Sequence, residues 1–163
     1  MKHCRAFAAL IGTVAVAALA IGNASGHSAA LSASYKGTVT EKVDGQTVTA
    51  IAKGKGTGTL AGKGTMGGTV VASTANPPCS PFSGPGVITG PKGKLKVKVL
   101  PISRGCAASE EDRDNISFSG SAKVTGGTGK YRGAKGTLRF SGHYDRAAGT
   151  FTVKLRGTLK LKS

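Results

Sequence analysis

The chain contains no tryptophan, and aromatic residues make up only 5% of its 163 positions. Its core must therefore be built from aliphatic side chains, of which the larger ones contribute roughly 1.5–3 kcal/mol each when buried. This favours many short strands over a few large packed elements. The scarcity of aromatic rings also argues against single-strand nucleic-acid binding, which depends on base stacking, so no sequence-specific nucleic-acid partner is expected.

Cysteine and histidine are scarce as well. The cysteines are Cys4, Cys79 and Cys106, there is no CxxC motif, and the histidines beyond the N-terminal segment are His27 and His143. Zinc sites and Cys/His catalytic centres need closely spaced groups of such residues. We therefore predict no metal, no cofactor and no catalytic residues, and the protein is expected not to be an enzyme.

The N-terminal segment has the layout of a secretory signal peptide. Lys2 and Arg5 precede an uncharged apolar run over residues 6–22, which ends in small residues. The run is short for a transmembrane span, which needs roughly 20 apolar residues. We predict a signal peptide over residues 1–26, with an uncleaved anchor as the alternative, and a secreted domain over residues 27–163. No transmembrane segment is expected after cleavage, and the predicted location is extracellular or periplasmic.

Removal of the signal peptide leaves two cysteines, Cys79 and Cys106. In an oxidising compartment such a pair is expected to form a disulfide. We predict this bond, which in the chain-entropy model stabilises the fold by roughly 3–4 kcal/mol.

Hydrophobic residues recur with a period of two, which is typical of half-buried strands. The clearest strand covers residues 150–162, and others are expected around residues 31–39, 47–52, 93–100, 116–124 and 137–144. The glycine-dense residues 54–68 form either short strands or a flexible loop. The proline-rich residues 76–81 are expected to be a loop. About eight strands without a helix predict a single all-β domain, either an antiparallel barrel or a sandwich.

One segment of the C-terminal third resembles a known family. The motif GGTG-Tyr-x-x-Ala-x-Gly resembles the barrel signature of dirigent and allene-oxide-cyclase-like proteins, and it comprises Gly126, Gly127, Thr128, Gly129, Tyr131, Ala134 and Gly136. The resemblance extends over residues 115–161 and implies an eight-stranded, calycin-like barrel with a central apolar cavity. The matching positions are turn and packing positions, so the resemblance carries over no catalytic residue.

Other motifs carry little chemistry. Residues 62–67 satisfy GxGxxG but lack the following helix that a dinucleotide site needs. The acidic residues at 110–114 lack the ligand spacing of a calcium loop and are interpreted as a solvated loop. His143 is expected on an outer face with no nucleophile assigned to it.

Positive charge is the most distinctive functional signal. Without Lys2 and Arg5, 21 basic residues stand against seven acidic ones, a formal charge of +14. Many of the basic residues alternate with apolar ones, so they are expected on outward faces of strands, where they attract polyanions. The alternative is that they keep the protein soluble and protect sheet edges. The predicted anionic-polymer site consists of Lys92, Lys94, Lys96, Lys98, Arg139, Lys154, Arg156, Lys160 and Lys162.

Two functional hypotheses follow. The preferred one is a secreted, non-enzymatic barrel that binds a small apolar ligand or an anionic extracellular polymer. The alternative is a dirigent-like or cyclase-like protein that steers an intramolecular reaction of an apolar substrate.

Overall fold

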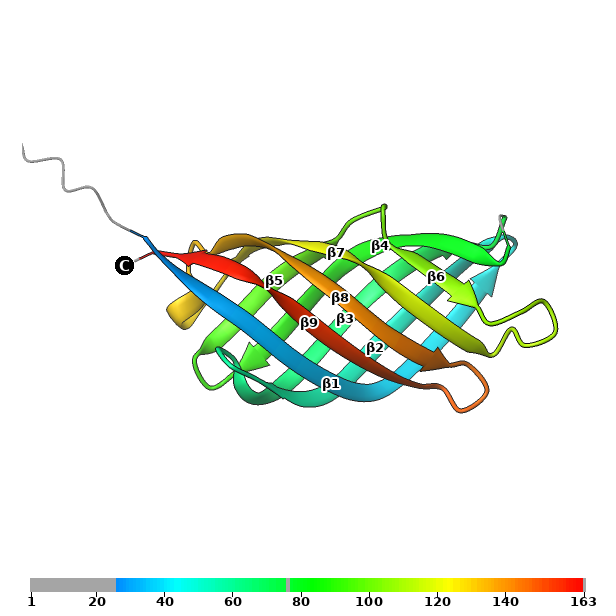
Figure 1. Cartoon of the computed structure of the whole chain (residues 1–163), viewed down its shortest axis with the longest axis horizontal. Helices are drawn as coiled ribbons and strands as arrows, with labels where there is room; N and C mark the ends of the chain where they lie inside the picture. Colours follow the sequence, from blue (N-terminus) through cyan, green and yellow to red (C-terminus); the bar gives the residue numbers. More distant parts are fainter. Residues whose placement is uncertain (1–25, 76, 163) are drawn as a thin grey trace, which may run out of the picture.

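The computed structural model describes residues 26–75 and 77–162, which form a closed antiparallel barrel (Figure 1). The predicted signal peptide lies, apart from Gly26, outside these residues. The predicted all-β barrel is confirmed, and the sandwich alternative is wrong, because β3 pairs with β4 and closes the sheet. The strands are β1 (His27–Asp44), β2 (Thr47–Gly58), β3 (Gly62–Ser73), β4 (Cys79–Gly90), β5 (Gly93–Val99), β6 (Arg104–Ala107), β7 (Asn115–Gly127), β8 (Lys135–Asp145) and β9 (Thr150–Leu161).

The nine strands occupy eight positions around the barrel, because β5 and β6 follow one another between β4 and β7. The break between them holds Ser103, which is fully buried and whose Oγ accepts a hydrogen bond from the Ser121 amide at 3.3 Å. Gly120 on β7 makes room for this side chain, since a Cβ there would collide with Ser103. The predicted number of eight strand positions is thus reached with one interrupted strand.

Two segments differ from or refine the sequence-based predictions. The glycine-dense residues 54–68 are strands apart from the turn at residues 59–61. They form much of the β2–β3 hairpin, in which Gly58 pairs with Gly62. The loop predicted at residues 76–81 is wrong at its end, because β4 begins at Cys79 and includes Pro81. Proline is tolerated there because the β3–β4 ladder stops at the Ala72–Phe82 pair, so no β3 residue pairs with Pro81.

The two ends of the barrel differ. At one end, here called the closed end, a 3₁₀ turn η1 (Gly129–Tyr131) follows β7 (Figure 1). It inserts Tyr131, which is 3% exposed and donates a hydrogen bond from its hydroxyl to the Leu60 carbonyl at 2.8 Å. Gly127 permits this, because a Cβ there would lie 2.7 Å from the Tyr131 Cβ. The GGTG-Tyr segment thus closes one end of the barrel.

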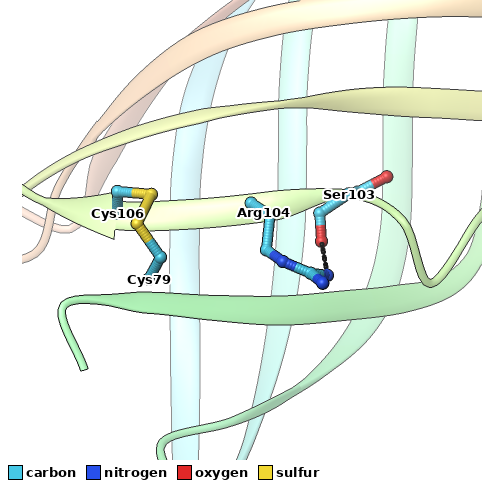
Figure 2. The surroundings of a disulfide bond; sticks show 4 residues. All are labelled: Cys79, Ser103, Arg104 and Cys106. Atoms are coloured by element: carbon cyan, nitrogen blue, oxygen red, sulfur yellow. Dashed lines mark hydrogen bonds between the residues drawn. A yellow bond between two sulfur atoms is a disulfide. The ribbon is translucent and has the colours of Figure 1, made fainter. Parts of the chain in front are cut away.

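The opposite end, here called the mouth, is formed by the β1–β2 and β8–β9 turns, residues 74–75 and 77–78, and the loop over residues 108–114. The disulfide Cys79–Cys106 joins β4 to β6 near this end, as predicted, with a Cα–Cα distance of 4.0 Å (Figure 2). It stabilises the short strand β6 against its neighbour. Beside it, Arg104 turns back along the chain, and its Nη1 donates to the Ser103 carbonyl (Figure 2). The same Nη1 also donates to the Pro101 carbonyl.

Candidate ligand-binding site

The mouth half of the barrel interior contains a cavity of about 450 Å³. Near the closed end the interior is filled by large buried side chains such as Tyr35, Leu95 and Leu138. Toward the mouth, the inward positions of β2 and β3 are small, for example Ala50 on β2 and Ala72 on β3. The cavity exists because these small side chains do not fill the space in front of them, and the larger side chains on the opposite wall do not extend far enough to fill it.

Three phenylalanines form an aromatic part of the cavity wall. Phe82 on β4, Phe118 on β7 and Phe140 on β8 all line the cavity, with ring centroids 6.0–6.4 Å apart. Phe82 and Phe118 meet edge to face at 86°. Such contacts hold the rings in fixed positions and present an apolar surface to the cavity.

The polar groups of the cavity lie near the mouth. Arg146 Nε donates to Glu41 Oε2 at 3.2 Å, and Arg146 Nη1 donates to the Arg113 carbonyl at 3.1 Å. Tyr144 is buried next to this pair. Burial raises the pKa of its hydroxyl, the Glu41 carboxylate raises it further, and the Arg146 guanidinium acts in the opposite direction. The Tyr144 hydroxyl therefore stays protonated at neutral pH and can donate a hydrogen bond.

The acidic loop at the mouth is organised by its own hydrogen bonds. Asn115 Nδ2 donates to both carboxylate oxygens of Asp112, at 2.9 and 2.7 Å, and this lowers the pKa of the Asp112 carboxyl. Across residues 26–75 and 77–162, no group of three or more His, Cys, Asp or Glu side chains is arranged to hold a metal ion. His143 is exposed on the outer face of β8, opposite Thr152.

The basic residues singled out from the sequence lie on the outer surface and are exposed. Lys92 lies in the β4–β5 turn, Lys94, Lys96 and Lys98 lie on β5, Arg139 lies on β8, Lys154, Arg156 and Lys160 lie on β9, and Lys162 follows β9. The sheet places Arg139 directly opposite Arg156. The row on β5 is separated from these residues by β7.

Lys123 on β7 connects the two groups, since it lies directly opposite Lys98. The alternation with the inward residues Ala122 and Val124 places it on the outer face, but the predicted anionic-polymer site did not include it. We call the outward basic residues along the strands the cationic wall: Lys36, Lys53, Lys55, Lys96, Lys98, Lys123, Arg139, Lys154 and Arg156. The closed-end cations are Lys63, Lys92, Lys94, Lys130, Arg132, Lys135, Lys160 and Lys162.

Acidic residues are confined to the mouth. Two lie among the last four positions of β1, four lie in the loop over residues 108–114, and one is the last residue of β8. They are Glu41, Asp44, Glu110, Glu111, Asp112, Asp114 and Asp145. These seven are all the acidic residues of the chain. The cationic wall and the closed end therefore carry basic charge alone.

Within the described residues, no helix is long and apolar enough to cross a membrane. Comparison of the chain with protein-family models and with curated proteins finds no match. The dirigent-like resemblance of the GGTG-Tyr segment stays a prediction.

Proposed function

We propose that the protein is a non-enzymatic binding protein that holds a small apolar ligand in the mouth half of its barrel. The observation that carries this proposal is the cavity of about 450 Å³ with a lining of aliphatic and phenylalanine side chains. Ligand sites are concave, mostly apolar and of roughly 300–1,000 Å³, with a few polar groups that orient the ligand. Glu41, Tyr144 and Arg146 supply such groups at the mouth.

The same proposal places the protein outside the cytoplasm. The Cys79–Cys106 disulfide supports this, because structural disulfides persist in oxidising compartments. The signal-peptide pattern at the start of the chain supports the same location.

An uncharged fluorescent probe such as N-phenyl-1-naphthylamine tests the cavity. We expect saturable binding to the native protein with enhanced probe emission. Ala50→Phe, which fills the cavity from β2, should abolish the enhancement. Ala30→Phe makes the same substitution at an exposed position of β1 and should leave it unchanged. Circular dichroism checks that both variants fold. Absence of binding to the native protein, or equal binding by both variants, would contradict the proposal.

A dirigent-like or cyclase-like role is the second candidate, and the polar groups at the cavity mouth favour it. The Tyr144 hydroxyl can donate a hydrogen bond to an oxygen of an apolar substrate, and the Glu41 carboxylate can accept one from a substrate hydroxyl. An apolar substrate that cyclises spontaneously to a racemic product tests this candidate. An excess of one enantiomer in the presence of the protein, lost in Glu41→Gln, would support steering. A racemic product would exclude steering and leave ligand binding as the proposed function.

A further inference from the structure

The outer surface of the barrel contains directly opposed like charges. Lys98 pairs with Lys123 and Arg139 pairs with Arg156 across neighbouring strands. Two further opposed pairs are Lys36 with Lys55 and Lys135 with Lys160. Like charges directly opposite one another on a sheet destabilise it. Four such pairs on one barrel therefore need a compensating partner or a functional reason.

The protein supplies almost no compensation itself. Among the residues that the structure describes, the single ion pair is Arg146–Glu41 at the mouth. Every acidic residue lies at that same end. Solubility or edge protection would be served equally well by mixed charges, and a closed barrel has no edge strand to protect. The separation of charge therefore indicates an anionic partner for the wall and the closed end.

We propose that the cationic wall and the closed end bind a linear polyanion that carries sulfate or phosphate groups, and that the cavity mouth stays free. The bound chain places its anionic groups between the opposed cations and relieves their repulsion. The acidic mouth repels the same chain, so the cavity remains accessible while the barrel is held. This role is independent of the apolar ligand proposed above.

The distribution of the cations favours a flexible chain over a flat bilayer. The opposed pairs lie on β1–β2, on β5–β7 and on β8–β9, so they extend around much of the barrel, and a planar surface can reach only one side at a time. The closed end also exposes none of the large hydrophobic side chains that would insert into lipid. The large exposed hydrophobic residues of the described chain are Val43, Ile51, Val71 and Ile102, and all four lie elsewhere.

A groove on the outer wall supports the same partner. It is lined by residues of β1, β2, β3, β4 and β9. Lys36, Lys53, Lys55 and the threonines Thr38 and Thr65 surround a floor of glycines and apolar side chains such as Met66 and Phe151. Ammonium groups and hydroxyls both donate hydrogen bonds to sulfate and phosphate oxygens. The wall carries more lysine than arginine, and lysine acts as a point charge rather than a planar fork. Binding should therefore depend on charge density and only weakly on the sequence of the polymer.

Heparin is the probe for this proposal, with titrations in 50–300 mM NaCl. The native protein should bind it with an affinity that falls steeply with salt. Lys98→Gln with Lys123→Gln removes one opposed pair and should weaken binding about tenfold and reduce the logarithmic salt slope by about 2. Lys42→Gln with Arg113→Gln removes two charges near the mouth and is the matched control. It should change the affinity less than twofold.

Thermal unfolding separates this proposal from a general charge effect. At low salt the Lys98/Lys123 variant should unfold at a higher temperature than the native protein, because repulsion has been removed, and heparin should raise its midpoint less.

Polyphosphate should act like heparin. The proposal would be overturned if the Lys98/Lys123 and Lys42/Arg113 variants lost equal heparin affinity, or if the native protein did not bind heparin. Tight binding to vesicles with 30% phosphatidylserine and none to heparin would assign a bilayer instead. Binding of the fluorescent probe is measured with and without heparin. Because the two sites are separate, heparin should leave probe binding unchanged, and either proposal can fail without the other.

Discussion

Removal of the Cys79–Cys106 disulfide should destabilise the barrel by about 3.5 kcal/mol. The two cysteines are 27 residues apart in the sequence, and closing a loop of that length in the unfolded chain gives this value in the chain-entropy model. For a domain of this size the loss corresponds to a fall in melting temperature of roughly 10–15 °C. The variant to compare is Cys79→Ser with Cys106→Ser, because it removes the bond without leaving a free thiol.

Urea denaturation followed by circular dichroism measures the effect. The native protein should lose stability when dithiothreitol is added, whereas the double variant should be unaffected by the reductant and match the reduced native protein. The loss should appear in the urea midpoint with a small change in slope, since the unfolded chain becomes less compact. Equal midpoints for the oxidised protein and the double variant would refute the reasoning. The ladder bonds of β6 to β4 and β7 would then be sufficient to hold this end of the barrel.

Three further predictions concern the interior. Tyr131→Phe loses a hydrogen bond to a backbone carbonyl and should cost about 1–2 kcal/mol, whereas Tyr35→Phe removes a buried hydroxyl without a hydrogen-bond partner and should be neutral or stabilising in the same urea assay. Gly120→Ala should lower the free energy of unfolding by about 1–3 kcal/mol, because the added Cβ collides with Ser103. Gly67→Ala is the control and should be tolerated, because a Cβ there meets its neighbours at ordinary contact distances. Equal losses in the two variants would contradict the geometry. Burial raises the pKa of Tyr35 and Tyr131, so the unfolded chain ionises first and stability should fall as the pH rises beyond about 10. Urea midpoints between pH 8 and 11 should show this fall, and it should be shallower in Tyr35→Phe.

Most of the fold could be predicted from the sequence because strand alternation is a local signal. In β9 the inward residues Phe151, Val153 and Leu155 alternate with exposed Thr152 and Lys154, as the period of two indicates. The same signal is weak where glycine replaces the inward side chain. Residues 54–68 alternate glycine with polar residues, so they read equally well as a loop, and only the pairing of β2 with β3 shows that they are strands.

The candidate site could be predicted only in part, since it depends on which residues meet across the barrel. The cavity results from Ala50 and Ala72 on one wall and Phe118 and Phe140 on another, and no local pattern gives the space between them. Similarly, the Lys98–Lys123 pair depends on the register between β5 and β7. The family resemblance predicted an apolar cavity, but it did not indicate which half of the barrel holds it.

The pairing of β1 with β9 has a consequence for folding during biosynthesis. His27 lies opposite Leu161, so the first and last strands of the described chain are neighbours in the barrel wall. Synthesis produces β1 long before its partner strand β9, and contacts so distant in sequence form slowly. The barrel therefore closes only after the C-terminal strand has emerged, and until then β1 carries an open backbone edge. The exposed serines Ser32 and Ser34 keep the outer face of that edge polar while it is unpaired.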